Sequence, residues 1–543
     1  MRKTSNRIEW FFRLGTFGQL AIAIAVCACH TDEATRTSGI EAADLCAAVT
    51  NDSLPDGYVS ITSFGAVGDG VTDDYAALRA SAAWLAEHPG GGIVYPPGRY
   101  KVNRIHDPIF HSGVDDGVYG DNIAYRGLDH VRIQGCDATV VRKGDFHQPA
   151  DVPPDYNTSS QTPLDVFEFY DSSYFVLDGF TLLGEVELTT RDAIAQTGGY
   201  GVVVAGSDHY QLSNLDISGF QMDGLIVGTS YMRGTAPPYE IMFDTDFVVE
   251  NVYSHHNGRQ ALTINQARRG TFTNVELAHT RDVGAYGGFA PGAGVDIEPD
   301  FFPGIAPEFD ITQKTGDLVF DNVRIHDNPG IAFGAAAGWA IENVAIRNST
   351  IIGVDHPISG PPILFGIANA VIENSYLDMR DSYLAADGWG PEAYAKQNPA
   401  LENDYLTVSF TMRNCYLTSS GPGLMFEAGA LESEPGTTFT AATVEDNVFV
   451  GTQPSDYAGT FPALGSPYAV FQRNFVQYPA TWSNEGTWPD APRIVANIDA
   501  AISADNTFTS AFPTPGITYL TYGAATAVSG DVFPTPDALS VLP

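Results

Sequence analysis

Basic residues are scarce in this chain of 543 residues, which holds 27 Lys and Arg against 65 Asp and Glu and carries a formal net charge of −38. Because binding to a nucleic acid requires clustered cations that contact phosphates, this balance excludes a nucleic-acid partner. It also disfavours unaided binding of a polyanionic sugar, unless a metal ion bridges the like charges. Apolar residues make up 44% of the chain, which excludes disorder of the chain as a whole.

Cysteine is also rare, with five in the whole chain. So few cysteines in a chain of this length do not make a disulfide framework, and their spacing matches no metal-binding motif. Cys136 and Cys415 fall in strand-like patterns, which predicts that both are buried and act as small apolar side chains.

The N-terminal residues have the pattern of an export signal. A basic head over residues 1–13 is followed by an apolar run over residues 20–26, which is too short to span a bilayer. The run ends in Val26-Cys27-Ala28-Cys29, which resembles the bacterial lipobox and implies lipidation of Cys29; plain secretion after cleavage near Ala28 is the alternative. We expect a signal over 1–28 and a polar tether over 29–55. The protein would then be an exported cell-envelope lipoprotein, at the outer surface or in the periplasm, or a secreted protein, with membrane contact only through the lipid anchor.

Short β-branched runs, bounded by Gly, Asn or Asp, recur every 23 to 37 residues between 201 and 330, and one follows further on. They are Gly201–Ala205, Gly224–Gly228, Ala261–Asn265, Gly294–Glu298, Gly330–Gly334 and Gly423–Glu427. A second strand type with a central Asn lies between them, over residues 212–217, 248–253, 272–277, 320–325 and 341–346. Repeats of this length that contain only strands predict a parallel β-helix. The repeated Asn predicts an internal side-chain ladder at a tight bend.

The start of the repeat, Val59–Leu78 followed by Gly90–Tyr100, resembles the opening of the pectate-lyase-like superfamily, in the branch related to polygalacturonases. The resemblance implies an all-β fold: a single-stranded, right-handed parallel β-helix (a solenoid) with an N-terminal capping helix. We expect the β-helix over 56–475 and a C-terminal cap or appended strands over 476–543. A monomer or a homotrimer would fit this superfamily.

The capping helix is also predicted from the residues themselves. Thr72 is placed to N-cap it, with Asp73 and Asp74 in the first turn, where the helix dipole favours negative charge. Apolar residues between 76 and 85 would cover the open end of the solenoid. Asp69, Asp73 and Asp74 are therefore interpreted as structural residues.

Function in a β-helix must lie on outward side chains and loops, because the interior is filled by stacked apolar residues. Strand alternation puts Asp296 and Glu298 on the same outward face, with Cα atoms about 7 Å apart. Thr263 and Asn265 of the preceding coil stand beside them. Small outward residues are expected to leave a groove for a sugar at Gly228, Ala332 and Gly334.

A carboxylate pair of this kind suits glycoside hydrolysis, in which one acid protonates the leaving oxygen and the other attacks the sugar or activates water. Asp296 and Glu298 are the predicted catalytic residues, and repulsion between them should raise one of the two pKa values. Arg259 could pair with one of these carboxylates or hold a sugar hydroxyl. The predicted substrate-binding residues are Arg259, Gln260, His256, Thr263, Asn265, Tyr286 and Asp300.

Two other interpretations of the same residues stay open. Asp296, Glu298, Asp300 and Asn265 offer oxygen ligands of the kind that Ca²⁺ takes, or they could simply hydrogen-bond the adjacent turns. His255 and His256 are interpreted as turn residues rather than as acid–base groups.

The polygalacturonase motifs Asn-Thr-Asp, Gly-His-Gly and Arg-Ile-Lys are absent, so that family's catalytic residues cannot be carried over. The favoured function is an exported glycoside hydrolase that cleaves a neutral or weakly charged polysaccharide or oligosaccharide and needs no cofactor. One alternative is a Ca²⁺-dependent polysaccharide lyase, in which Arg259 or a His abstracts the proton beside the uronate carboxyl. The other is a non-catalytic β-helix that binds glycan at the cell surface.

Overall fold

The protein is described from a computed structural model. The described residues are 41–102, 123–142, 144–145, 166–184, 186–187, 199–229, 232–233, 240–282, 288–299, 314–335, 341–358, 362–365, 367–382, 384–386, 407–419, 426–428, 438–451, 463–465, 469–478, 496–499, 502–510, 520–522 and 527–532. The predicted export signal and Cys29 lie outside them. None of the helices in this part of the chain is long and apolar enough to cross a membrane.

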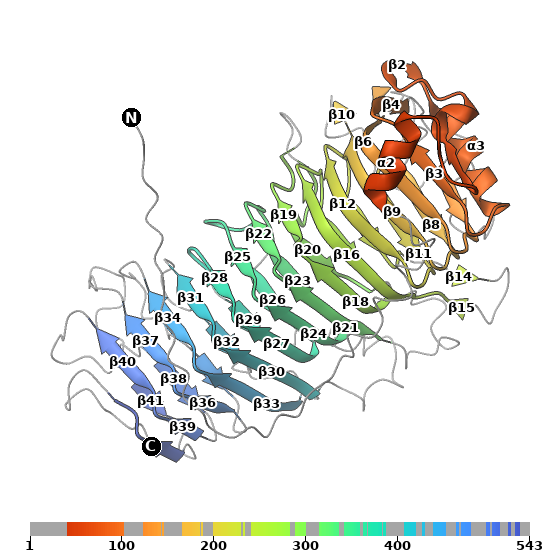
Figure 1. The fold of residues 1–543 in the computed structure, drawn as a ribbon. Helices are drawn as coiled ribbons and strands as arrows, with labels where there is room; N and C mark the ends of the chain where they lie inside the picture. The colour runs from red at the N-terminus through yellow and green to blue at the C-terminus, as the bar shows by residue number, and fades with distance from the viewer. Residues whose placement is uncertain are drawn as a thin grey trace, which may run out of the picture.

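Two long parallel sheets wind together along the molecule (Figure 1). The 13-stranded sheet contains β5 (Ala124–Arg126), β8 (Phe167–Tyr170), β11 (Val202–Ala205), β13 (Leu225–Val227), β17 (Leu262–Ile264), β20 (Val295–Ile297), β23 (Phe333–Ala335), β26 (Ile363–Phe365), β29 (Leu384–Ala386), β32 (Phe426–Ala428), β35 (Ala463–Gly465), β38 (Ala496–Asp499) and β41 (Leu520–Tyr522).

The 25-stranded sheet supplies the remaining sides of each coil. Its strands are β1 (Tyr58–Ser60), β2 (Asp69–Asp73), β3 (Gly92–Tyr95), β4 (Gly98–Val102), β6 (Arg132–Arg142), β9 (Val176–Leu183), β12 (Gln211–Ser218), β16 (Asp244–His255), β18 (Ala267–Thr273), β19 (Glu276–Ala278), β21 (Thr315–Asp321), β22 (Arg324–His326), β24 (Ile341–Arg347), β25 (Thr350–Ile352), β27 (Ala368–Glu373), β28 (Tyr376–Asp378), β30 (Thr407–Arg413), β31 (Tyr416–Ser419), β33 (Thr438–Glu445), β34 (Val448–Gly451), β36 (Val470–Gln472), β37 (Phe475–Tyr478), β39 (Ile502–Ala504), β40 (Thr507–Ser510) and β42 (Ala527–Ser529).

The chain is a right-handed parallel β-helix, as the sequence predicts. Small additions are the pair β7 (Gly144–Asp145) and β10 (Val186–Glu187), the antiparallel pair β14 (Met232–Arg233) and β15 (Glu240–Ile241), the 3₁₀ helix Ile61–Phe64, and the helices α2 (Ala42–Thr50) and α3 (Tyr75–Ala86). Parallel pairing continues through β38 to β42, so the coils carry on beyond residue 475.

The interior is a column of apolar side chains that stack from coil to coil. Leu225, Leu262 and Val295 are paired in register and are at most 1% exposed, as alternation predicts. The next residue in this column is Phe333 and not Ile331, and Gly334 rather than Ala332 stands beside Asp296. Ala332 is fully buried in the core, so its predicted outward position is wrong. The strand begins two residues later than expected because residues 331 and 332 still belong to the preceding turn.

The repeated Asn forms a ladder at the bend between β18 and β19 and at equivalent bends, but the ladder lies outside. Asn274 donates to Asn251 (3.2 Å) and Asn322 donates to Asn274 (2.5 Å), across exposed surface. All three have φ of 55°, a left-handed backbone that Asn tolerates. An internal ladder exists elsewhere, formed by Asn447, Asn474 and Asn506, which are at most 1% exposed.

Helix α3 covers the first coils, as expected, but Thr72 does not cap it. The N-cap residue is Asp74, whose carboxylate accepts backbone hydrogen bonds from Val67 (2.7 Å), Gly68 (3.2 Å) and Lys101 (3.3 Å). The Thr72 hydroxyl instead donates to Asp69 (2.9 Å). Asp69, Asp73 and Asp74 all accept backbone hydrogen bonds, which confirms their structural interpretation.

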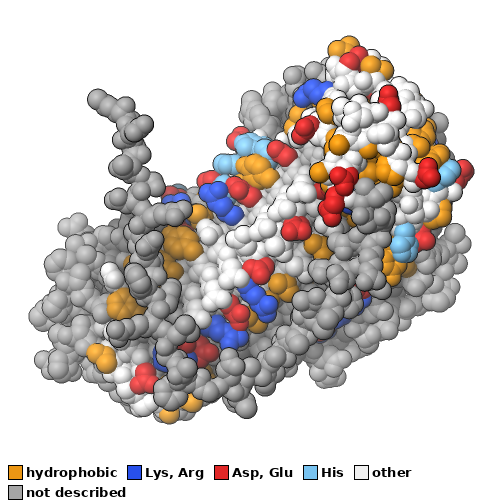
Figure 2. Space-filling model, in the orientation of Figure 1, with side chains coloured by type: hydrophobic (Ala, Val, Ile, Leu, Met, Phe, Trp, Pro, Cys, Tyr) orange, Lys and Arg blue, Asp and Glu red, His pale blue; other side chains and the backbone are white. Residues whose placement is uncertain are grey.

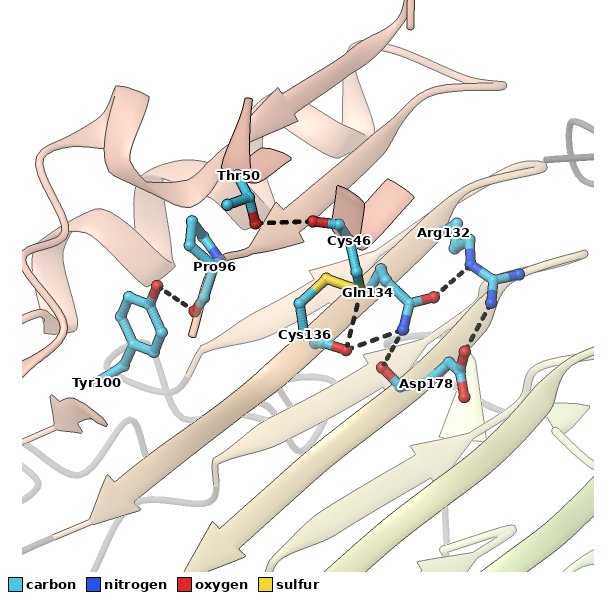
Figure 3. Close-up of a disulfide and its surroundings, with 9 residues drawn as sticks. Cys46, Thr50, Pro96, Tyr100, Arg132, Gln134, Cys136 and Asp178 are labelled. Carbon is cyan, nitrogen blue, oxygen red and sulfur yellow. Dashed lines mark hydrogen bonds and ion pairs between the residues drawn. A yellow bond between two sulfur atoms is a disulfide. The ribbon is translucent and has the colours of Figure 1, made fainter. Parts of the chain in front are cut away.

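A disulfide joins Cys46 of α2 to Cys136 of β6, with Cα atoms 5.3 Å apart (Figure 3). The prediction that Cys136 is an unpaired buried residue is therefore wrong, whereas Cys415 is a free buried thiol. Leu45 and Val49 of α2 are also buried in a cluster with Cys136, so the predicted tether over 29–55 does not hold from residue 42 onward. Two cysteines 90 residues apart in the sequence give no sign of this proximity until the coils are stacked.

Candidate functional site

Asp296 projects from the outer face of β20, midway along the 13-stranded sheet, and Glu298 follows directly after the end of this strand. Val295 and Ile297, which alternate with them, are at most 1% exposed and fill the interior. Asp296 is half-buried and Glu298 is exposed. In the register of the sheet, Asp296 lies between Thr263 of β17 and Gly334 of β23. The two acids thus point outward together from one strand.

A buried ion pair in the two preceding coils, those of β13 and β17, supports this strand. Asp223, just before β13, is fully buried and accepts hydrogen bonds from Arg259 Nε (2.8 Å) and Nη2 (2.5 Å). It also accepts from the Gln260 backbone N–H (3.2 Å) and the Thr263 hydroxyl (2.8 Å). Burial alone would lower the pKa of Arg259, but the charge and hydrogen bonds of Asp223 raise it above its ordinary value.

Of the two roles expected for Arg259, pairing with an outward acid is wrong, because its Nε and Nη2 bond Asp223; that it holds a sugar hydroxyl stays a prediction. Asp223 was not predicted as a residue of this site. Asp223 precedes Gly224 as Gln260 precedes Ala261, so it occupies the same place in its coil as a predicted residue. Comparison of that position between coils was the signal that could have found it.

The Gln260 side chain connects the buried ion pair to Asp296. Its amide is hydrogen-bonded to the Asp296 carboxyl at one end and to the Thr263 hydroxyl at the other. An amide presents a donor on one side and an acceptor on the other. With its NH₂ toward Asp296, it binds the carboxylate, and its oxygen then competes with Asp223 for the single Thr263 O–H. Turned over, its oxygen accepts from the protonated carboxyl while its NH₂ donates to Thr263, whose O–H stays with Asp223. Gln260 can therefore hold Asp296 in either protonation state.

Burial raises the pKa of Asp296 from 3.8 to about 7, the Glu298 charge contributes in the same direction, and Arg259 acts against both. The predicted repulsion between the two acids is present, but desolvation is the larger cause. A carboxyl group with a pKa near neutrality can give up and regain a proton during a reaction cycle.

The outward neighbours of the pair differ from the expected row of small residues. A Cβ atom at Gly228 would lie 2.1 Å from the Gln266 carbonyl oxygen, so backbone fills that position and no groove forms there. At Gly334 a Cβ would lie 3.6 Å from Asp296 Oδ1 and 3.3 Å from Ile331 Cγ2, so glycine keeps this side of Asp296 open, next to an apolar side chain. Of the three predicted small neighbours, only Gly334 flanks the acids.

The structure brings together only part of the predicted binding set. Gln260 and Thr263 contact the acids or their support, and the Asn265 amide donates to the Glu298 carbonyl oxygen (2.7 Å). His256 instead contacts His255, His279 and Asp282. Tyr286 and Asp300 lie outside the described residues. The Ca²⁺ interpretation depends on Asp300 and so stays a prediction.

Comparison with known proteins gives similarity over part of the chain. No family model matches it. Two mannuronan C5-epimerases of Azotobacter vinelandii, AlgE2 and AlgE5, are 25% and 26% identical to it over 263 and 265 residues, which is 42% of this chain and 24% of each relative. AlgE4 is 38% identical over 86 residues, 15% of this chain and 14% of the relative. The chain thus spans about a quarter of the length of the first two relatives.

Solved structures match over most of the chain at low sequence identity. The N-terminal fragment of bacteriophage Phi29 gene product 12 has a TM-score of 0.51 at 14% identity and covers 91% of this chain and 73% of that one. The AlgE4 A-module from Azotobacter vinelandii has a TM-score of 0.39 at 12% identity, covering 88% and 95%. The chain is therefore a right-handed parallel β-helix that is similar in sequence, over two fifths of its length, to mannuronan C5-epimerases.

Proposed function

We propose that this protein is an exported enzyme that hydrolyses a polysaccharide, with Asp296 as the general acid and Glu298 as the nucleophile or base. The observation that carries the proposal is the pair itself: a half-buried carboxyl with a pKa of about 7 beside an exposed carboxyl on the same strand face. At neutral pH, Asp296 is protonated in a substantial fraction of molecules and can protonate a glycosidic oxygen.

In this mechanism, the Asp296 proton goes to the leaving sugar oxygen as the glycosidic bond breaks. Glu298 either attacks the anomeric carbon or takes a proton from the attacking water. Gln260 holds Asp296 in place before and after the transfer, because its amide can bind both forms of the carboxyl. The net charge of −38 favours a neutral or weakly charged glycan over a polyanionic one.

A second candidate is proton abstraction at C5 of a uronate residue, the chemistry of an epimerase or a lyase. The specific observation in its favour is the similarity to mannuronan C5-epimerases. Arg259, whose Nε and Nη2 bond Asp223, would then offer its Nη1 to the substrate carboxylate, and Glu298 would take the proton. Arg259 itself is a poor candidate for the base, because Asp223 raises its pKa and keeps it protonated.

Export is supported by the disulfide between Cys46 and Cys136, since structural disulfides persist in oxidising compartments and are rare in the cytosol. Lipidation of Cys29 is proposed from the lipobox alone.

A panel of neutral glucans, galactans and mannans, together with mannuronan and pectate, tests the proposal. Hydrolysis predicts new reducing ends on a neutral glycan with no absorbance from unsaturated uronates and no loss of rate in EDTA. Incorporation of deuterium at C5 of a uronate in D₂O, without chain cleavage, would select epimerisation instead. Unsaturated uronate absorbance that EDTA abolishes would select the Ca²⁺-dependent lyase, and the absence of all three signals would select glycan binding.

The pH dependence follows from the raised pKa of Asp296. Activity that needs the protonated carboxyl should fall as the pH rises through about 7. The contribution of Asp296 to folding stability changes with pH in the same direction: it is fully present below the unfolded pKa, near 3.8, and is lost as the pH rises through the folded value.

In Glu298→Gln, the pKa of Asp296 measured by carbon NMR should fall, because the variant removes the Glu298 charge that raises this pKa. An unchanged or higher pKa in that variant would contradict the assignment.

A further inference from the structure

Histidines and carboxylates gather at a second place, on the edge of the solenoid where β16, β19 and β22 end. His255 of β16, Ala278 of β19 and His326 of β22 are paired in register. The next residue in each coil, His256, His279 and Asp327, has a left-handed φ of 52°, 53° and 55°. The same backbone turn in three successive coils therefore aims these side chains at one edge. Figure 2 shows histidines and carboxylates side by side over this region.

The side chains of two of these coils approach one another closely enough to share an ion. His326 Nδ1 lies 2.6 Å and His279 Nε2 lies 3.9 Å from Asp327 Oδ2. One ligand atom from each of His279, His326 and Asp327 lies within 4.8 Å of the others. Ligands at zinc bond lengths in a tetrahedral site are about 3.4 Å apart, so small side-chain rotations would close the site.

His326 is oriented by a carboxylate at its second ring nitrogen, Nε2. Its Nε2 lies 2.8 Å from Glu276 Oε1, and Arg324 Nη1 donates to the same oxygen (3.1 Å). A neutral imidazole has only one N–H, yet His326 has a carboxylate oxygen at each nitrogen. Two arrangements satisfy both partners: a doubly protonated ring, or a metal ion at Nδ1 with the N–H on Nε2 donating to Glu276. A histidine held between a metal and a carboxylate is a recurrent feature of metal sites.

We propose that His279, His326 and Asp327 bind a divalent transition-metal ion such as Zn²⁺, with Glu276 as a positioning residue. Two imidazoles and one carboxylate suit zinc, whereas Ca²⁺ takes oxygen ligands. The His326 side chain is 9% exposed and that of Asp327 is 58% exposed, so the ion would be anchored on a buried ligand and open to water at its fourth position. The ion would join the coils of β19 and β22. Neither Asp296 nor Glu298 belongs to this site, so its test is independent of the proposed function.

Calorimetric titration of the full chain with ZnCl₂ after EDTA treatment, at about pH 7.5, tests the proposal. Wild type should bind one equivalent that is lost in His279→Asn and in Asp327→Asn. Asn is chosen because it tolerates the left-handed backbone at both positions. Glu276→Gln should bind about 10–100-fold more weakly, as for other second-shell carboxylates.

His130→Asn is the matched control. His130 lies in a different coil from the proposed site, and it also has a left-handed φ, 55°. Its Nδ1 lies 2.6 Å from the carboxylate of the adjacent Asp129. It should bind zinc as wild type does. The absorption spectrum of bound Co²⁺ gives a second readout, which should be present in wild type and in His130→Asn and absent in Asp327→Asn. The proposal is overturned if wild type binds no stoichiometric zinc, or if His279→Asn and Asp327→Asn bind it as tightly as wild type and His130→Asn do.

Discussion

Asp296→Asn and Glu298→Gln are each expected to lower kcat/KM on the responsive polysaccharide by about 10²- to 10⁴-fold, the usual contribution of a general acid or base. Asp296→Asn cannot supply the proton, although it keeps the size of the side chain and a partner for Gln260. Glu298→Gln removes the attacking or water-activating carboxylate. Steady-state kinetics on the glycan that the panel identifies measures both losses.

Thermal unfolding separates loss of chemistry from loss of fold in these variants. Glu298 is exposed and Asp296 is half-buried, so both variants should unfold within a few degrees of wild type. Asp137→Asn is the matched control, because Asp137 is an exposed carboxylate on β6 with a left-handed φ of 51° that Asn adopts readily. It should keep full activity. Full activity in either site variant would remove Asp296 and Glu298 from the catalytic role.

Asp223→Ala is expected to destabilise the protein by about 3–5 kcal/mol, the typical cost of removing one partner from a buried ion pair. The change leaves the Arg259 guanidinium without its fully buried counter-charge and takes the acceptor from the Thr263 hydroxyl. Denaturant unfolding measures the loss. Hydrogen exchange should locate it in β13, β17 and β20, because each coil of a solenoid contacts mainly its neighbours.

Two further variants make this prediction specific. Asp216→Asn removes an exposed carboxylate on β12, 49% accessible, that pairs with His255 of β16, and it should cost less than about 1 kcal/mol. Asp223→Leu combined with Arg259→Met should recover much of the loss, since an apolar pair of similar volume avoids the desolvation of both charges. Equal losses of unfolding free energy in Asp223→Ala and Asp216→Asn would show that the buried pair stabilises the protein no more than an exposed one.

The positions of the two outward acids were predictable because strand alternation has a period of two and one face of each strand is buried. Val295 and Ile297 must be inside, so Asp296 and Glu298 must be outside. The pairing of Asp296 with Thr263 also followed, because the repeats that begin at Ala261 and Gly294 pair at equal positions. The predicted register was wrong by two residues at β23, because the sequence of residues 330–335 does not show how many of them belong to the preceding turn.

Contacts between coils were the part that could not be predicted. The ion pair of Asp223 with Arg259, the disulfide, and the contact of His279 with Asp327 join residues 36, 90 and 48 positions apart. Each depends on the lengths of the intervening turns, which set the register of one coil on the next. Asn251 and Asn274 illustrate the same point: the ladder was predicted, but the left-handed bend put their side chains outside.

The amino-acid sequence alone determined the β-helix, the apolar interior and the outward direction of the two acids, because these follow from local periodicity and from the burial of one strand face. Only the tertiary structure decided that Arg259 belongs to Asp223, that Gln260 connects this pair to Asp296, and that burial raises the pKa of Asp296. Those properties depend on which coils stack and how deeply each group is enclosed, and distance and desolvation are fixed only when the chain has folded.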